Sequence, residues 1–568
     1  MAVEDVSIET GKTKTFSALD YVIFAAILVI SASIGFYNAW KDRRDLTLKN
    51  FLLAGGNMQL LPVALSLLAS FMSAITLLGT PVEMYIYSTM YFYIGIGYFF
   101  VMAGAAHIYV PIFYRLRITS VYEYLERRWS KMVRTAGSLT FCIQMLLYMA
   151  IVLYAPSLAL NQVTGFTLWG AVVSVGTVCT IYTAFGGMKA VLWTDCFQVG
   201  MMMAGLLAVL IRGSMAVGGF AAAWEKMESS GRVFFDDFRP DPGVRHSFWS
   251  CVVGGYFTWV AIYGVNQAQV QRASTCPTLR RAQMALWLNV PGLWIILYLG
   301  CMIGVVVYAF YSECDPIGSG FIAAKDQILP LFVMDVLGDV TGLPGLFVAC
   351  LFSGALSTIS SGLNSMAAVI LEDVVKAYIK PDISELRATR LTQMFALVLG
   401  MAALSLFGMI AGPLLGLFTM GMVFPWANKW GAISGLLTSL AFMFWIGVGA
   451  FIEKPPVDPT PPTLSTAGCL FNRNMTTVAP TTTVAAVTTT TERSPVYLLY
   501  TLSYIWYGFY AVITVNVVGL LVSFATGYTK ASEVDPKLMC PIFDIIPPFC
   551  FLPEAIRKPL RMGVVHKG

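Results

Sequence analysis

The stretch LFVACLFSGALSTISSGLNSMAAVILEDVV, Leu346–Val375, decides the fold of this chain. It exceeds the roughly 20 apolar residues that cross a bilayer as a helix, and its charged residues begin only near its end. At helical spacing, hydroxyl and amide side chains fall on one face of it, namely Ser353, Ser357, Ser361 and Asn364. The stretch therefore predicts a buried transmembrane helix with a polar stripe.

The polar stripe has two interpretations. Small residues and hydroxyls let membrane helices approach closely and can bond their own backbone, which would make the stripe a packing surface. Alternatively, neutral hydroxyls and carbonyls supply oxygen ligands to a hard, dehydrated cation such as Na⁺ without placing a fixed charge in the membrane. The adjacent hydroxyls of Ser357 and Thr358 are the best candidates for such ligands.

The composition of the whole chain is that of a polytopic membrane protein. Of its 568 residues, 57% are hydrophobic and only 12% are charged, whereas soluble domains carry about 25% charged residues. The cysteines lack the spacing of a zinc site, there are three histidines, and no nucleophile–base pair is found. We therefore expect a protein that is not an enzyme, with the lipid bilayer as its surroundings, no organic cofactor and no nucleic-acid partner.

Hydropathy divides the chain into membrane spans joined by loops. A basic loop at 41–49 belongs in the cytoplasm by the positive-inside rule, so the N-terminus is expected outside. The same rule places inside the loop that contains Arg272, Arg280 and Arg281. The expected spans are 18–40, 58–80, 88–114, 136–160, 167–185, 190–211, 247–269, 282–311, 346–375, 431–452 and 497–526.

Two of these spans are interrupted by small and polar residues. The span 58–80 contains several serines and Gly79, and Pro81 follows it; the span 247–269 ends in Gly264 and a run of amides. Such segments at membrane depth predict helices that unwind, so that free carbonyls face an ion or a substrate instead of lipid. An ordinary kinked helix is the alternative.

One acidic residue, Asp195, falls inside the sixth span. A carboxylate at that depth is costly unless it is paired or hydrated, and Asp195 is therefore a functional candidate. The alternative is a carboxylate that a neighbouring hydroxyl anchors near the membrane interface.

The region 391–427 decides the topology of everything after it. It is long for one helix and short for two, and only a cramped hairpin keeps the basic tail 528–568 in the cytoplasm. The hairpin also places the threonine-rich loop 452–496 outside, which agrees with its glycosylation sequon at Asn474. We therefore expect a cytoplasmic C-terminus.

Cys314 and Cys469 are the two cysteines that this topology places in extracellular loops. An oxidising exterior favours a disulfide between them. Such a bridge would join the loop before 346–375 to the loop before the last span. Two independent thiols are the alternative, because the sequence does not fix the distance between them.

Several phrases of the chain together resemble the sodium/solute symporter family. They cover nearly the whole chain apart from its external loops and tail, and they are LLAGGNM (52–58), LASFMSAITLLGTP (68–81), AFGGMKAVLWTDCFQ (184–198), YGVNQAQVQR (263–272), SGALSTISSGLNSMAAV (353–369) and GPLLGLF (412–418). The resemblance implies an all-α polytopic membrane protein with the inverted repeat of leucine transporters, five helices plus five. One helix at 18–40 would precede a first repeat at 57–213 and a second at 247–427, with two further helices within 431–527.

The resemblance also implies site residues. A sodium ion would be held by the carbonyls of Ala69, Met72 and Gly354 and by the hydroxyls of Ser357 and Thr358. Asp195 matches an aspartate near the inward route of the ion and would serve in coupling. The residues expected to line the central cavity are Phe71, Thr76, Trp259, Tyr263 and Gln267.

Within the family, the chain is most similar to the anion carriers. The phrase SAITLLGTP (73–81) resembles the monocarboxylate carriers, which implies Na⁺-driven import of lactate, pyruvate, a short-chain fatty acid or nicotinate across the plasma membrane. A multivitamin carrier for biotin or pantothenate is the alternative. The region 391–427 also lacks about one helix of family residues, which leaves a sensor or an inactive form as a further alternative.

Overall fold

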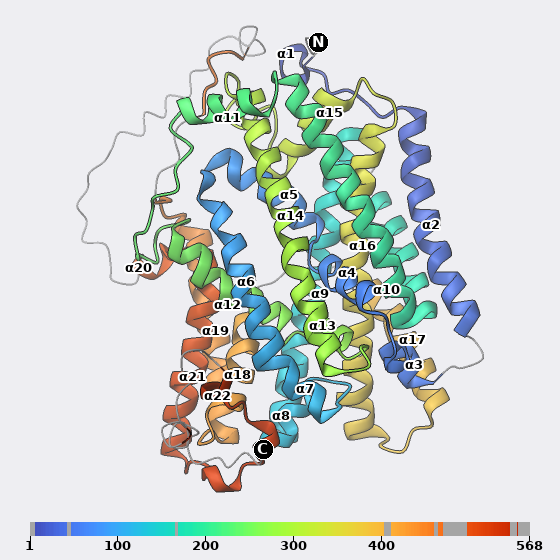
Figure 1. Cartoon of the computed structure of the whole chain (residues 1–568), viewed down its shortest axis with the longest axis vertical. Coiled ribbons are helices and arrows are strands. Elements are labelled where there is room, and N and C mark those ends of the chain that lie inside the picture. Colours follow the sequence, from blue (N-terminus) through green and yellow to red (C-terminus); the bar gives the residue numbers. More distant parts are fainter. Residues whose placement is uncertain are drawn as a thin grey trace.

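The computed structural model describes residues 6–42, 47–164, 168–402, 411–458, 464–469, 497–545 and 554 of the chain, and its regular elements are helices. The helices of the first part run roughly alongside one another (Figure 1). They are α1 (Ser7–Thr10), α2 (Ala18–Asp42), α3 (Leu48–Leu53), η1 (Ala54–Gly56), α4 (Leu60–Ala69), α5 (Ala74–Ile86), η2 (Thr89–Tyr93), α6 (Ile94–Gly104), η3 (Ala105–Tyr109), α7 (Val110–Leu116), α8 (Glu123–Arg128), α9 (Lys131–Thr164) and α10 (Leu168–Ala216).

The second part of the chain adds a similar series and two long helices at its end. These elements are α11 (Phe220–Ser229), η4 (Ser250–Gly254), α12 (Gly255–Tyr263), α13 (Gln267–Ala273), α14 (Leu279–Tyr311), η5 (Lys325–Gln327), α15 (Ile328–Leu337), α16 (Leu343–Ile370), η6 (Leu371–Ile379), α17 (Glu385–Ala402), α18 (Ala411–Val423), α19 (Lys429–Glu453), α20 (Tyr497–Tyr500), η8 (Tyr504–Trp506), α21 (Tyr507–Ala525), η9 (Ala531–Glu533), η10 (Pro536–Leu538) and α22 (Ile542–Ile545).

Helix α16 is the central element, as its apolar sequence predicts. Every side chain from Phe347 to Val369 is buried, and the helix packs against α10, α9, α2 and α17. Gly342, at a φ of 98°, precedes it and Pro344 lies in its first turn, where the missing proline N–H costs no hydrogen bond. The polar stripe of α16 therefore faces protein on all sides.

Eight helices of the described residues are long and apolar enough to cross a membrane, or nine if the bent pair α3–α4 is one span. This is fewer than the sequence predicts, partly because α5 and the continuous pair of η4 and α12 are too short on their own. Helix α10 covers two expected spans, and Gly187 interrupts it with a kink at a φ of 59°. A side chain there would meet Phe51 at 2.8 Å, so the kink requires glycine.

The two ends of the molecule carry different parts of the chain. At the end that contains α15, the backbone N–H of Ser7 donates to the carboxylate of Asp335 at 2.8 Å. At the end that contains α8, the Tyr124 hydroxyl donates to the carbonyl of Leu538 at 3.0 Å. The first and last described helices therefore lie at opposite ends, which we call the α15 end and the α8 end (Figure 1).

The region 391–427 contains parts of two helices, α17 and α18, and residues 403–410 between them lie outside the described residues. Both outer ends of this pair approach the α8 end. Arg134 of α9 pairs with Asp373 of η6 at 2.5 Å, and Arg128 of α8 donates to the Gly421 carbonyl of α18 at 3.0 Å. The residues before α17 and the end of α18 therefore both lie at the α8 end.

Candidate cation and substrate site

The span expected to unwind at 58–80 is broken in the structure. Helix α4 ends at Ala69, and α5 begins at Ala74 with Ser73 in extended conformation before it. Serine favours such a position because its short polar side chain competes for backbone hydrogen bonds. The break leaves carbonyl groups at the end of α4 without partners from a following helical turn.

The hydroxyls of α16 meet these carbonyls. The Ser357 hydroxyl lies 2.9 Å from the Ala69 carbonyl oxygen, and the Thr358 hydroxyl lies 2.9 Å from that of Ser70. Both hydroxyls also lie 3.0 Å from the carbonyl oxygen of Gly354, one turn earlier in α16. The structure therefore brings together four of the five expected ligands and adds Ser70, which the sequence argument did not include.

Gly354 lets the fifth group approach. A Cβ atom at this position would lie only 3.1 Å from the carbonyl oxygen of Met72 and 3.1 Å from the backbone nitrogen of Ala74. That is closer than ordinary van der Waals contact, so a larger residue would push α16 away from the break. Glycine thus brings the Met72 carbonyl against the helix that carries Ser357 and Thr358.

Each of the two hydroxyls, on Ser357 and Thr358, can donate to only one of the two carbonyl oxygens beside it. The Gly354 carbonyl also accepts a backbone N–H within α16, so the carbonyls of Ala69 and Ser70 are the ones that depend on these protons. A cation that binds carbonyl and hydroxyl oxygens would satisfy all of them at once. We define the cation cradle as Ala69, Ser70, Met72, Gly354, Ser357 and Thr358.

Asp195 lies near the cradle and is paired. Its carboxylate accepts a hydrogen bond from the Ser66 hydroxyl of α4, and it lies 3.3 Å from the guanidinium of Arg272 of α13. Both side chains of the ion pair are fully buried. Arg272 does not lie in the loop expected after the span 247–269, because it belongs to the buried helix α13 and meets Asp195. The cytoplasmic side of the loop that contains Arg280 and Arg281 stays a prediction.

Hydrogen bonds connect this ion pair to the cradle. Arg272 donates to the hydroxyls of Ser66, at 2.7 Å, and of Ser361. Ser361 in turn lies 3.4 Å from the Ser70 hydroxyl and bonds the carbonyl of Ser357. The polar stripe of α16 therefore continues from the cradle to the ion pair.

A cavity of about 280 Å³ lies on the other side of the break. Phe71 of the break lines it and stacks on Tyr148 of α9, with ring centroids 5.8 Å apart. Thr258 and Ile262 of α12 complete one wall, and α18 and α21 supply further residues. None of the described lining residues carries a charge.

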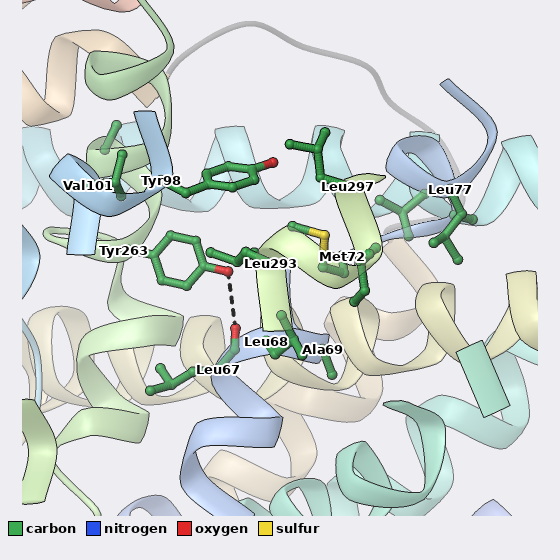
Figure 2. Packing of buried hydrophobic residues seen from close by; sticks show 14 of the residues in the cluster. Leu67, Leu68, Ala69, Met72, Leu77, Tyr98, Val101, Tyr263, Leu293 and Leu297 are labelled. Carbon is green, nitrogen blue, oxygen red and sulfur yellow. Dashed lines mark hydrogen bonds between the residues drawn. The ribbon is translucent and has the colours of Figure 1, made fainter. Parts of the chain in front are cut away.

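The other residues expected at a central cavity are not among its lining residues. Trp259 and Tyr263 stack on each other with centroids 6.3 Å apart, and the Tyr263 hydroxyl donates to the Leu67 carbonyl of α4 (Figure 2). Thr76 is half-buried in α5. Gln267 is buried and bonds the backbone of Thr119 instead.

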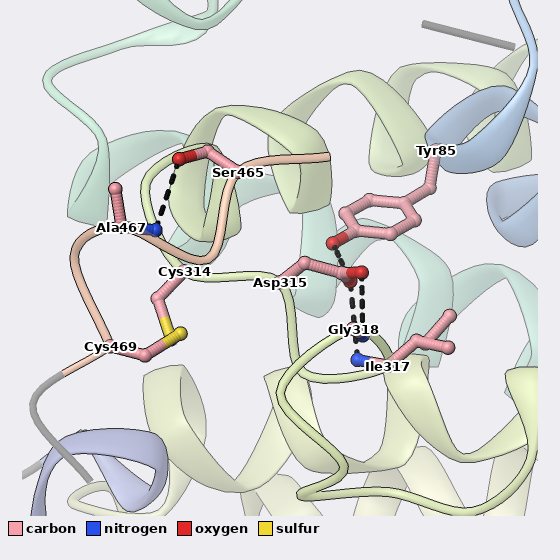
Figure 3. Close-up of a disulfide and its surroundings, with 8 residues drawn as sticks. All are labelled: Tyr85, Cys314, Asp315, Ile317, Gly318, Ser465, Ala467 and Cys469. Carbon is pink, nitrogen blue, oxygen red and sulfur yellow. Dashed lines mark hydrogen bonds between the residues drawn. A yellow bond between two sulfur atoms is a disulfide. The ribbon is translucent and has the colours of Figure 1, made fainter. Parts of the chain in front are cut away.

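A disulfide and an ion cluster lie toward the α15 end. Cys314 and Cys469 form a disulfide with Cα atoms 4.9 Å apart, and the neighbouring Asp315 accepts a hydrogen bond from Tyr85 at 2.6 Å (Figure 3). The expected glycosylation site, Asn474, lies outside the described residues.

The ion cluster contains a buried histidine. Glu83 of α5 pairs with Arg245 at 2.6 Å and lies 3.3 Å from the Nε2 atom of His246. Burial lowers the pKa of His246 to about 4 and outweighs the opposite effect of Glu83. The histidine is therefore neutral in the folded protein near neutral pH.

Comparisons with known proteins show the family and the fold of the chain. The model of the sodium:solute symporter family matches residues 51–438. The chain is 43% identical to sodium-coupled monocarboxylate transporter 2 of Mus musculus over 98% of this chain and 91% of that protein. It is 46% identical to the sodium-dependent multivitamin transporter of Oryctolagus cuniculus over 93% and 86%. Among solved structures, a Na⁺-coupled sialic acid symporter has the same fold, with a TM-score of 0.73, 22% identity and coverage of 90% and 98%.

Proposed function

Because the chain belongs to the sodium:solute symporter family, we propose that it imports a small organic monocarboxylate together with Na⁺ by alternating access. Lactate, pyruvate, a short-chain fatty acid and nicotinate are the substrates to be tested first. Relatives of similar identity are named as monocarboxylate transporters. The transported ion and the anion are both cargo, and no organic cofactor is required.

The cation cradle is the observation that carries this proposal. Its oxygens come from α4, from the break after α4 and from α16, so one ion would join parts of the chain that are almost 300 residues apart. All of these oxygens are neutral, which suits a small monovalent ion that must be released again. We assign Na⁺ to Ala69, Met72, Gly354, Ser357 and Thr358, with the Ser70 carbonyl as an additional ligand.

Sodium binding would favour one conformation of the transporter. An ion in the cradle stabilises the arrangement in which the break lies against α16, and it shifts the population toward that state by its differential affinity. Substrate and Na⁺ then each raise the affinity for the other. Asp195 would take part in this coupling, because Ser66 and Arg272 connect its carboxylate to the stripe of α16.

The cavity beside Phe71 is the proposed substrate site. Its described lining is mostly apolar, with hydroxyl and amide donors from Tyr148, Thr258 and Gln144. Such a lining suits a carboxylate with a small apolar body. A monovalent anion also needs more than one Na⁺ for import that the membrane potential assists, since each charge gains about 2.3 kcal/mol per 100 mV.

Two alternatives remain to be separated by experiment. The identity to the multivitamin transporter, 46%, is no lower than that to the monocarboxylate transporters, so biotin and pantothenate belong in the same assay. The region 391–427 is long for one membrane-spanning helix and short for two. This short region favours a form that binds Na⁺ without completing the transport cycle as the third candidate.

The test is uptake into proteoliposomes that contain the purified protein. Radiolabelled lactate, nicotinate, biotin, pantothenate and iodide are offered in Na⁺ medium and in choline medium. We expect Na⁺-dependent uptake of lactate or nicotinate. Uptake of only the vitamins would favour the second candidate, and a Na⁺ leak without uptake of any solute would favour the third.

We further propose that the α15 end faces the outside of the plasma membrane and the α8 end faces the cytoplasm. The disulfide and the loop 452–496, which contains the sequon at Asn474, support an extracellular α15 end. The basic side chains of α8 and of the start of α9 support a cytoplasmic α8 end. Glycosidase treatment of protein from a glycosylating host should change its mobility, and Asn474→Gln should abolish the change. An unchanged mobility of the wild type would contradict this orientation.

A further inference from the structure

Helix α13 carries two buried glutamines, Gln267 and Gln271, that bond to other parts of the chain. The side-chain oxygen of Gln267 accepts the backbone N–H of Val121 at 2.8 Å, and its NH₂ group donates to the carbonyl of Thr119 at 2.8 Å. The NH₂ group of Gln271 donates to the carbonyl of Leu52 at 2.8 Å. The two amides also bond each other at 3.3 Å.

These bonds form a continuous ladder across three separate segments. It runs from α3 through Gln271 and Gln267 to the loop between α7 and α8. Helix α3 precedes α4 in the first half of the chain, whereas α13 is the second half of the helix that breaks between Tyr263 of α12 and Gln267. A relative movement of the two halves that separates α13 from α3 must therefore break the ladder.

The ladder borders a second cavity, of about 540 Å³, which lies among elements of the α8 end. Leu52 and Thr119, whose carbonyls accept the ladder's hydrogen bonds, both line this cavity. Cys276, which follows α13, lines it as well and is 2% exposed. On the opposite side of α13, Gln269 donates to the Leu67 carbonyl of α4 at 3.0 Å. The ladder thus lies between this second cavity and α4, the helix that precedes the first break.

The chemistry of the ladder suits a contact that opens and closes. Its members are neutral amides and backbone groups, so breaking it leaves no unpaired charge in a low-dielectric environment. The neighbouring pair of Asp195 and Arg272 is different, because its separation would leave two buried charges. Water that enters from the cavity can replace the amide bonds one by one.

We propose that Gln267 and Gln271 form a latch. It holds closed the route from the binding site to the second cavity, and it opens when Na⁺ and the anion are released toward the α8 end. The proposal rests on the symport function proposed above. In it both glutamines are positioning residues: they hold α13 against α3 and against the loop between α7 and α8, and they do not bind Na⁺ or the substrate. Loss of one latch bond should favour the open state by about two- to tenfold, the range typical of a net hydrogen bond.

Cys276 provides a native reporter for this opening. The purified protein in lipid nanodiscs, which expose both ends, is treated with a polar maleimide, and the rate of Cys276 modification is measured by mass spectrometry. Gln267→Leu and Gln271→Leu should each raise this rate about two- to tenfold, and Gln271→Met provides a second variant in case Gln271→Leu does not fold. Cys276→Ser gives the background of the assay.

Gln283→Leu is the matched control. Its amide also donates to one backbone carbonyl, that of Ala106 at 2.9 Å, but it joins α14 to η3 and not α13 to α3. Gln283→Leu should leave the rate of Cys276 modification unchanged. Equal rates in the wild type and in the folded latch variants would overturn the latch, as would an equal rise in Gln283→Leu.

The labelling assay does not require transport, and the two proposals can therefore fail separately. Wild-type protein that shows no Na⁺-dependent uptake, together with faster labelling in the latch variants, would overturn the symport function and leave the latch as a conformational lock. Na⁺-dependent uptake with unchanged labelling would overturn the latch alone.

Discussion

Replacing Thr358 by valine tests the cation cradle directly, because the two side chains have nearly the same shape. The change removes the hydroxyl that lies 2.9 Å from the Ser70 carbonyl and 3.0 Å from the Gly354 carbonyl. Thr358 is fully buried, so water does not replace the lost hydroxyl from bulk solvent. Sodium loses one oxygen ligand, and the Ser70 carbonyl loses its donor in the ion-free protein.

The size of the effect follows from the loss of one oxygen that faces the ion. A contact between a polar group and a charge is worth about 1.5–3 kcal/mol, and each 1.4 kcal/mol is about tenfold in an equilibrium constant. The concentration of Na⁺ that half-activates uptake should therefore rise by about 12- to 140-fold, whereas Thr358→Ser should stay within a few-fold of the wild type. Alanine at this position should act in the same direction as valine.

The assay is Na⁺ activation of uptake at saturating substrate in proteoliposomes, normalised to the amount of reconstituted protein. Thermal unfolding in Na⁺ and in choline gives a second readout, because an ion that binds the native state stabilises it. Ser365→Ala is the matched control: its hydroxyl is buried in the same helix but donates within that helix, to the carbonyl of Gly362 at 2.9 Å. A wild-type Na⁺ dependence in Thr358→Val would show that the cradle does not bind the transported ion.

Three further predictions follow from contacts described above. Asp195→Asn should destabilise the protein by about 3–5 kcal/mol, because it leaves a buried guanidinium without its partner, and adding Arg272→Gln should recover part of the loss in chemical denaturation. An impermeant maleimide should label neither Cys314 nor Cys469 on intact cells before mild reduction and both after it; labelling without reduction would rule out the disulfide in cells. His246 is neutral in the folded protein down to about pH 4 but ordinarily binds a proton below about 6.5. The unfolded state therefore binds more protons between these values, and stability should fall as the pH falls through this window. His246→Gln should reduce this slope in thermal melts, and an unchanged slope would contradict the assignment.

Several features of the fold could be predicted from local patterns. The apolar length and the serine spacing of Leu346–Val375 identify the buried helix α16, since both are periodic properties of one segment. The break after Ala69 follows from serines and a proline at membrane depth. The second break, before Gln267, follows from a glycine and amides in the same way. In each case the signal and the structure lie within the same few turns of chain.

The partners of polar side chains could not be predicted in this way. Arg272 was assigned to a loop because the positive-inside rule counts charges near the end of a span, and it does not register that α13 is the buried second half of a broken helix. Its partner, Asp195, is 77 residues earlier. A buried carboxylate is costly without a cationic partner. This cost was the one signal in the sequence that could have pointed to Arg272. Gln267 was placed at the substrate cavity from the family resemblance, and only the fold brings Thr119 and Val121 to it.

The cation cradle has a consequence for how the chain can evolve. At Ala69, Ser70 and Met72 the oxygen that faces α16 belongs to the main chain, so a change of side chain there leaves the chemical identity of that group untouched. Selection on ion binding therefore acts at these positions only through helix geometry, and it acts on side-chain chemistry at Ser357 and Thr358 and on size at Gly354. Descendants of this sequence could drift at half of the cradle and still keep all of its oxygens, so that counting identical residues would underestimate how well such a site is inherited.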